Sequence, residues 1–168
     1  MDLPVDQRQP EARPSEPPGG RVLLVCSSGG HLAQLYRLQP WWRRRHRTWV
    51  TFDTPDATSL LADEDVVWAH RPTTRNLRNL ARNTVLAWRT MRRLRPSLVV
   101  SDGAGVALPF FLLARLSGIP TAYLEVYDRI DSRTLTGRLC YPLSSLFLLQ
   151  WTDQAALYPK GLVVGRLL

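Results

Sequence analysis

The sequence predicts an α/β fold, in which a Rossmann-like parallel sheet carries helices on both faces. Short apolar runs alternate along the chain with longer segments of helical periodicity. The apolar runs are nearly continuous, as in strands that are buried on both sides of a parallel sheet. The chain of 168 residues is long enough for one such domain with a core of its own.

The first twenty residues stand apart from this pattern. They contain five prolines and end in Gly19-Gly20. A segment of this composition cannot bury a core. We therefore expect a disordered Pro-rich leader over 1–20 and a single Rossmann-like domain over 21–168.

Seven segments are predicted as strands because β-branched and leucine residues dominate them and turn-forming residues bound them. They are 21–26, 47–52, 65–69, 97–101, 120–126, 146–150 and 161–165. Helical segments are expected between them, at 31–45, 55–62, 75–94, 105–117, 134–144 and 152–158. In a doubly wound sheet, ligands bind at the carboxyl ends of the strands.

The predicted helix 75–94 has two contrasting faces at 3.6 residues per turn. One face is expected to carry Leu77, Leu80, Ala81, Thr84, Trp88 and Met91. The opposite face carries a stripe formed by Arg75, Arg78, Arg82, Arg89 and Arg93. The stripe is either the solvated side of a surface helix or a contact for anionic lipid headgroups or a partner.

The net charge of +8 favours anionic partners: nucleic acid, an acidic membrane surface or phosphate-bearing substrates. No nucleic-acid-binding motif is present, so we do not expect nucleic acid to be the partner. Trp41 and Trp42 precede Arg43 and Arg44. This pattern suits an interfacial aromatic and basic patch, although ordinary packing of one tryptophan explains it equally well.

The sequence gives no sign of secretion or of a membrane span. There is no signal peptide, and the longest apolar run, 104–114, is much shorter than the roughly 20 residues that cross a bilayer. Cys26 and Cys140 have neither zinc-ligand spacing nor a disulfide pattern. A reducing, cytoplasmic setting is expected, and no segment is expected to span a membrane.

A first glycine-containing stretch, Ser27-Ser28-Gly29-Gly30-His31, follows a predicted strand and opens a helix. Its amide groups and the positive end of the helix dipole suit an anion. The stretch matches neither the dinucleotide fingerprint nor the Walker loop. It is either a structural turn or an anion-binding loop.

A second stretch, Ser101-Asp102-Gly103-Ala104-Gly105, also lies between a strand and a helix. Asp102 is expected to cap that helix, or both glycine stretches face one crevice at the strand ends. In a third stretch, Glu125 ends an apolar strand and is expected to point into the same crevice.

His31 is the candidate for acid–base chemistry, because imidazole titrates near neutral pH. His46 and His70 lack a comparable setting and are expected at the surface or in packing. Asp128 and Asp131 are interpreted as helix caps or arginine partners, and no metal site or cofactor is expected.

Six segments of the chain resemble the acceptor-side subunit of two-part polysaccharide glycosyltransferases. They are "SSGGHLAQL" (27–35), "WVTFDTPDATSLL" (49–61), "PTTRNLRNLARNTVLAW" (72–88), "SDGAGVALPFF" (101–111), "LEVYDRIDSRTLTGRLCYP" (124–142) and "QWTDQAALYPK" (150–160). This family includes bacterial capsule and exopolysaccharide proteins. It also includes the eukaryotic subunit that recruits the dolichol-linked N-acetylglucosamine transferase to the membrane.

The resemblance implies the N-terminal half of a GT-B glycosyltransferase, which needs a separate donor-binding subunit and is inactive alone. It implies that His31 or Glu125 acts as catalytic base. It further implies that an acceptor pyrophosphate is held by Ser27, Ser28, Gly29, Gly30, Gly103, Ala104, Gly105 and Arg129. GT-B chemistry commonly proceeds without a bound metal.

The function expected from the sequence is thus the acceptor subunit of a heteromeric glycosyltransferase. It would lie peripherally on the cytoplasmic face of the inner or plasma membrane and bind a polyprenyl-pyrophosphate-linked sugar. It would present the hydroxyl group of this sugar to a UDP-sugar held by its partner. An anionic membrane surface would be contacted by Trp41, Trp42, Arg43, Arg44, Arg75, Arg78, Arg82 and Arg89. The alternative is a non-catalytic scaffold that recruits and activates the catalytic partner.

Overall fold

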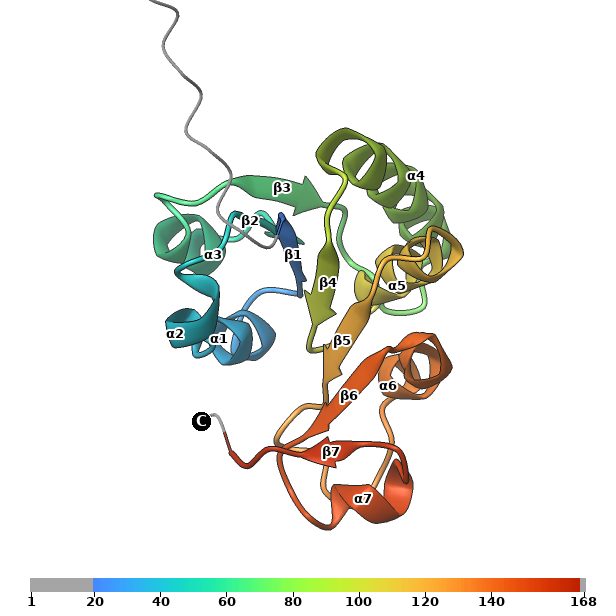
Figure 1. The fold of residues 1–168 in the computed structure, drawn as a ribbon. Helices are drawn as coiled ribbons and strands as arrows, with labels where there is room; N and C mark the ends of the chain where they lie inside the picture. Colours follow the sequence, from blue (N-terminus) through green and yellow to red (C-terminus); the bar gives the residue numbers. More distant parts are fainter. Residues whose placement is uncertain (1–19, 167–168) are drawn as a thin grey trace, which may run out of the picture.

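Seven parallel strands form one sheet in the order β3-β2-β1-β4-β5-β6-β7 (Figure 1). The structure is a computed structural model that describes residues 20–166, so the predicted leader lies outside the described residues except for Gly20. The strands are β1 Val22–Val25, β2 Arg47–Phe52, β3 Val66–Ala69, β4 Leu98–Ser101, β5 Thr121–Leu124, β6 Leu146–Leu149 and β7 Leu162–Val163. The predicted parallel sheet is confirmed.

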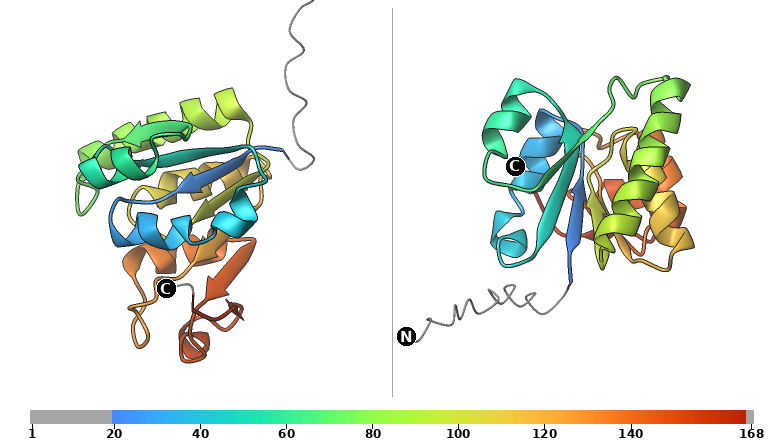
Figure 2. Two further views of the ribbon diagram at one scale, coloured as in Figure 1. Left: turned by 90° about the vertical axis from the view of Figure 1, so that its left-hand side faces the viewer. Right: turned by 90° about the horizontal axis from the view of Figure 1, so that it is seen from above.

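Helices cover both faces of this sheet (Figure 2). On one side lie α1 Gly30–Tyr36, α2 Gln39–Trp42 and α3 Pro55–Leu60. On the other side lie α4 Leu77–Leu94, α5 Ala107–Leu116 and α6 Leu135–Cys140, the last continued by the short helix η1 Tyr141–Leu143. A short helix, α7 Gln154–Leu157, connects β6 to β7.

Alternation along the strands divides the core into two layers. Leu24 and Trp49 pack with the α1–α3 side, whereas Leu23 and Val50 pack with the α4–α6 side. Successive residues of a strand point to opposite faces, so each strand supplies both layers. This alternation also determines which way the polar residues at the strand ends point.

The predicted helix 31–45 is broken into α1 and α2. Pro40 lies in the first turn of α2, where its missing N–H costs nothing, but it cannot lie inside a longer helix. The break buries Trp42, whose indole N–H donates to the carbonyl oxygen of Leu35 at 3.1 Å and whose ring lies edge-on to Trp49. Trp42 is therefore a core residue, and its assignment to a membrane patch was wrong.

The buried face of α4 also differs from the predicted one. It is formed by Asn79, Asn83, Ala87, Thr90 and Met91, whereas Leu77 is 80% exposed and Trp88 is 48% exposed. Asn83 accepts a hydrogen bond from the His70 amide at 2.8 Å and donates to the His70 carbonyl at 2.9 Å. Asn79 donates to the carbonyl of Pro72 and thus fixes the same segment before the helix. Because Asn79 and Asn83 make these bonds, they lie on the buried face of α4, and apolar residues such as Leu77 and Trp88 are exposed instead.

The predicted membrane patch is divided between the two sides of the sheet. Trp41, Arg43 and Arg44 lie on or beside α2, while Arg78, Arg82 and Arg89 lie on α4 (Figure 1). Arg75 precedes α4 and has a left-handed backbone with a φ of 49°. The two groups therefore lie on opposite faces of the sheet. Among residues 20–166, no helix has the length and apolar character needed to cross a membrane.

Part of the sheet on the α1–α3 side has no helix over it among the described residues. Apolar side chains of β4, β5 and β6 line a groove of about 570 Å³ there, together with Trp41 and Val164. Parallel sheets are almost always covered on both faces. This open face is thus an unusual feature of the domain.

Candidate functional site

A crevice lies at the carboxyl ends of β1, β4 and β5. It consists of two cavities of about 170 and 210 Å³ that share His31, Val126 and Asp128 in their walls. The first is also lined by Gly30, Gln34 and Tyr127. The second is also lined by Ala104, Tyr123, Arg129, Thr134 and Thr136. The structure therefore brings together four of the predicted site residues: Gly30, His31, Ala104 and Arg129.

His31 is paired with a buried carboxylate at the bottom of this crevice. Its Nδ1 lies 3.2 Å from Oδ2 of Asp102, and its side chain is 30% exposed whereas that of Asp102 is fully buried. Val100, two residues before Asp102, faces the α1–α3 side, so alternation turns Asp102 toward α1. The predicted helix cap is wrong, because α5 begins after Val106 without a side-chain cap.

The pair perturbs both titrations. Burial raises the pKa of Asp102 to about 6, although its contact with His31 opposes the shift. Burial lowers the pKa of His31, but the neighbouring carboxylate of Asp102 outweighs this, and the pKa is raised. With Nδ1 against the carboxylate, Nε2 of neutral His31 is the atom that can accept a proton.

Two buried glutamines extend the pair into the protein. Nε2 of Gln34 donates to Oδ2 of Asp102 at 3.3 Å. Nε2 of Gln150 donates to Oε1 of Gln34 and to the carbonyl oxygen of Glu125, both at 2.9 Å. Sequence reasoning missed Gln34 and Gln150. The signal for Gln34 was a polar residue between Leu32 and Leu35 on the buried side of α1.

The first glycine stretch forms the turn into α1. Gly29 has a φ of 69°, a conformation that side chains rarely adopt, so glycine suits this position. Its amide already donates to the carboxylate of Asp56 at 2.9 Å. Ser27 and Ser28 are half-buried and line neither cavity. Only Gly30 and His31 of this stretch reach the crevice.

The second glycine stretch closes tightly around its neighbours. A Cβ on Gly103 would lie 2.8 Å from the hydroxyl oxygen of Tyr123, and one on Gly105 would lie 3.0 Å from Cβ of Thr73. Ala104, between them, has a positive φ of 61°. Gly103 and Gly105 thus allow close packing, and only Ala104 lines the crevice.

Glu125 does not point into the crevice, so this prediction was wrong. It is fully buried, and its Oε2 lies where a Cβ on Gly137 of α6 would be only 2.5 Å away. Tyr123 faces the α4–α6 side and lines the larger cavity, whereas Glu125, which alternation sends the same way, is fully buried and lines neither cavity. Burial raises the pKa of Glu125, although the nearby hydroxyl groups of Tyr158 and Thr134 and the hydrogen bond from the Val126 amide oppose the shift.

The loop after β5 forms the outer wall of the crevice. Gln154 donates to the carbonyl oxygens of Val126 and Arg129, both at 2.9 Å, and the indole of Trp151 donates to that of Tyr127. These bonds hold Arg129 at the mouth of the larger cavity. Within residues 20–166, no group of three or more His, Cys, Asp or Glu side chains is placed to hold a metal ion.

Comparison with known proteins assigns the sequence to a family. The model of the family described as "Oligosaccharide biosynthesis protein Alg14 like" matches residues 69–167, more than half of the chain. The chain belongs to the Alg14 family. The match contains the second glycine stretch, Asp102 and the outer loop.

Curated Alg14 relatives extend the match over the first glycine stretch. The human UDP-N-acetylglucosamine transferase subunit ALG14 is 27% identical over 87% of this chain and 82% of its own length. The subunit of the same name from Debaryomyces hansenii is 26% identical over 92% of this chain and 79% of its own length.

Solved structures agree on the fold. MurG from Acinetobacter baumannii superposes with a TM-score of 0.66 at 20% identity, over 80% of this chain and 42% of that one. A UDP-GlcNAc 2-epimerase from Neisseria meningitidis superposes with a TM-score of 0.68 at 14% identity, over 88% and 47%. The Alg14-family chain thus has a Rossmann-like fold that spans less than half of each of these two proteins.

Proposed function

We propose that this chain is the acceptor-binding subunit of a two-component GT-B glycosyltransferase. It binds a polyprenyl-pyrophosphate-linked sugar, and a partner subunit holds the UDP-sugar donor. The names of the Alg14 relatives support N-acetylglucosamine as the transferred sugar and lipid-linked oligosaccharide synthesis as the setting. The observation that carries the proposal is the His31–Asp102 pair in a crevice at the strand ends, where this fold binds ligands.

The proposed role of His31 is that of general base. Nε2 takes the proton of the acceptor hydroxyl while the hydroxyl oxygen attacks the anomeric carbon of the donor sugar. A bond forms between the acceptor oxygen and the anomeric carbon, the bond between that carbon and UDP breaks, and UDP is left in the donor site of the partner subunit. Asp102 stabilises the imidazolium that results. Glu125 is fully buried and lines neither cavity, so His31 is proposed as the base in its place.

Arg129 is proposed to hold the acceptor pyrophosphate. It lines the larger cavity together with His31 and Ala104, and the outer loop that carries it is anchored by Gln154. A guanidinium is well suited to phosphate oxygens because it offers several donors in one plane. The amide of Gly29 is not available in the same way, since Asp56 already occupies it.

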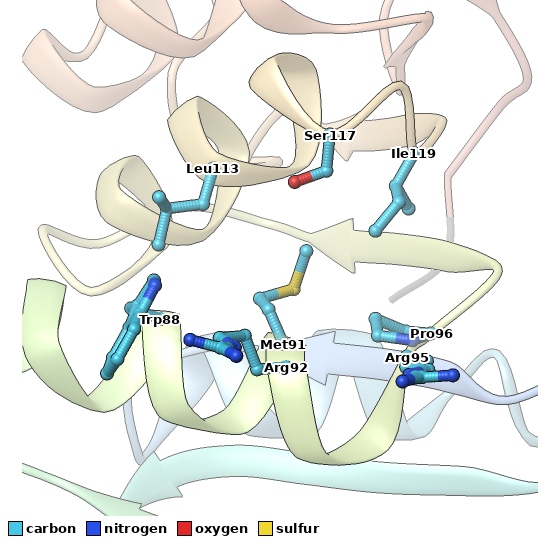
Figure 3. A pocket seen from close by; sticks show the side chains of 8 residues that line it. All are labelled: Trp88, Met91, Arg92, Arg95, Pro96, Leu113, Ser117 and Ile119. Carbon is cyan, nitrogen blue, oxygen red and sulfur yellow. The ribbon is translucent and has the colours of Figure 1, made fainter.

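The proposed membrane contact is the outer side of α4 and its junction with α5. Arg78, Arg82 and Arg89 are exposed there, beside the half-exposed Trp88. Figure 3 shows Trp88 and Arg92 of α4 facing Leu113 of α5 across a cavity of about 460 Å³, with Arg95 at its end. Exposed cations next to partly exposed apolar side chains suit an anionic lipid surface, and the proposed localisation is peripheral on the cytoplasmic leaflet.

The function is tested by reconstitution with the donor-binding subunit. The two chains are co-expressed, and transfer is followed from labelled UDP-N-acetylglucosamine to a polyprenyl-pyrophosphate-linked sugar in membranes. His31→Ala is expected to lower kcat by about 10²–10⁴-fold, the range for loss of a general base. His70→Ala is the matched control, because His70 lies outside the crevice.

The same experiment separates catalysis from scaffolding. If His31→Ala transfers sugar at the full rate and still recruits the partner to membranes, the chain is a non-catalytic scaffold. If neither the wild type nor the variant supports transfer with any donor subunit, the glycosyltransferase proposal fails as a whole.

A further inference from the structure

The buried amides behind the crevice form a directional chain that ends at His31. It runs from Gln150 through Gln34 to Asp102, and the three side chains are 2%, 1% and 0% exposed. They come from the segment after β6, from α1 and from the segment after β4. Alternation directs Gln150 and Asp102 toward α1, because Leu149 before Gln150 lies in the opposite layer, and Val100, two residues before Asp102, lies in the layer on the α1–α3 side.

The direction of donation along these hydrogen bonds is fixed at the Glu125 carbonyl oxygen, which can accept a hydrogen bond but cannot donate one. The carbonyl oxygen of Glu125 requires a donor, so the amino group of Gln150 must face it. The same amino group donates its second hydrogen to Oε1 of Gln34, and Nε2 of Gln150 lies 2.9 Å from that oxygen. Gln34 is thereby oriented with its own amino group toward Asp102, whose Oδ2 accepts at 3.3 Å.

We infer that Gln34 and Gln150 are positioning residues that set the tautomer of His31. They hold Oδ2 of Asp102 as an acceptor at the point where it also faces Nδ1 of His31. The proton of the neutral imidazole is then kept on Nδ1, and Nε2 is left free toward the cavity. The inference rests on the proposed function only in giving Nε2 the role of base; the tautomer itself is independent of any activity.

The test is ¹⁵N NMR of the histidine side chains in the full chain. The sequence contains three histidines, so His46 and His70 serve as internal references in the same spectrum. Above the pKa of His31, the wild type is expected to show the Nδ1–H form predominantly. Gln34→Met keeps the length of the side chain and removes its donor, and the ratio of Nδ1–H to Nε2–H is expected to fall about fivefold, the factor for loss of one hydrogen bond.

The order of the hydrogen bonds, from Gln150 to Gln34 to Asp102, gives a second and sharper test of the inference. Gln150→Met is expected to lower the same ratio, because Gln34 loses the donor that orients it. The double variant is expected to equal Gln34→Met alone, since the effect of Gln150 on Asp102 passes through Gln34. Gln39→Met is the matched control, the same substitution on the neighbouring helix α2 in a side chain that lies outside the chain of amides.

Three results would overturn the inference: an Nε2–H form in the wild type, an unchanged ratio in Gln34→Met, or additive effects in the double variant. Each is read from folded protein without substrate. A failure of the sugar-transfer assay therefore leaves this inference standing. An unchanged ratio in Gln34→Met or additive effects in the double variant leave the proposed reaction standing, whereas an Nε2–H form in the wild type would also remove Nε2 as its base.

Discussion

His31 and Asp102 make the proposed activity dependent on pH in a defined direction. The base must be neutral, so kcat/KM is expected to rise with pH through the pKa of His31, which lies above its ordinary value of 6.5. Asp102→Asn removes the negative charge that raises this pKa and leaves only a neutral amide beside His31, while the burial that lowers the pKa stays. The rising limb is therefore expected to move to lower pH while the plateau rate falls.

The measurement is a pH–rate profile of the reconstituted pair of subunits. A limb that stays in place in Asp102→Asn would show that a group other than His31 controls the profile. Because Asp102 has a pKa near 6 and contacts His31, the limb in the wild type reports the pair rather than either residue alone.

Gly137 is a single-residue test of the packing around Glu125. A Cβ there would lie 2.5 Å from Oε2 of Glu125 and equally close to the hydroxyl oxygen of Tyr158. Gly137→Ala is therefore expected to destabilise the protein by about 1–3 kcal/mol, as measured by urea unfolding. Gly30→Ala is the control, because its Cβ would meet nothing within 4 Å. Equal stability of the two variants would contradict the packing described for Glu125.

At the scale of the element, α4 shows how two polar residues override an apolar pattern. Asn83→Ala removes the hydrogen-bond partner of both the amide and the carbonyl of His70. The substitution is expected to lower the free energy of unfolding by roughly 2–4 kcal/mol. Leu77→Ala is expected to change the stability by less than about 0.5 kcal/mol, because Leu77 is largely exposed. Urea unfolding of both variants checks which one is less stable. A larger loss of stability for Leu77→Ala would favour the apolar buried face that was predicted from the sequence.

The elements themselves were largely predictable, because hydrophobic periodicity decides them. The segment 47–52 was predicted with the bounds that β2 has, and each of the other predicted strands overlaps an observed one. The face of α4 was not predictable in this way. Periodicity scores Asn83 as polar and therefore outward, whereas the backbone groups of His70 need a buried partner.

The candidate site was predictable in its location and not in its pairings. The glycine stretches marked the carboxyl edge of the sheet, and His31 does line the crevice. The directions of Asp102 and Glu125 follow from strand alternation continued past β4 and β5, which a search for glycine motifs does not use. Which buried amides meet Asp102 depends on the packing of α1 against strands that are distant in sequence.

At the scale of the whole molecule, the two sides of the sheet separate the arginines into groups that can be tested against each other. Replacing Arg78, Arg82 and Arg89 of α4 by glutamine is expected to weaken binding to anionic vesicles about 100-fold, at roughly 1 kcal/mol for each arginine. The matched control replaces the exposed Arg37, Arg43 and Arg44 on the α1–α3 side. Vesicle co-sedimentation measures both, and equal losses would contradict a single membrane-facing side.

The groove over β4, β5 and β6 has a consequence for the chain in isolation. A folded protein with an apolar sheet layer open to water is expected to bind an apolar dye such as ANS while its near-ultraviolet circular dichroism remains native. The combination distinguishes this state from a molten globule, which binds the dye but has lost that signal. Absence of dye binding would mean that the layer is closed in solution.

Dye fluorescence can then be used as an assay for a protein or ligand that binds over the groove. A protein or ligand that covers the groove is expected to displace the dye and to raise the midpoint of thermal unfolding with its concentration. Leu146 and Val164, at the rim of the groove, are both more than a third exposed, so charged substitutions there leave the core intact. Titration of such a variant separates occupation of this face from binding anywhere else on the molecule.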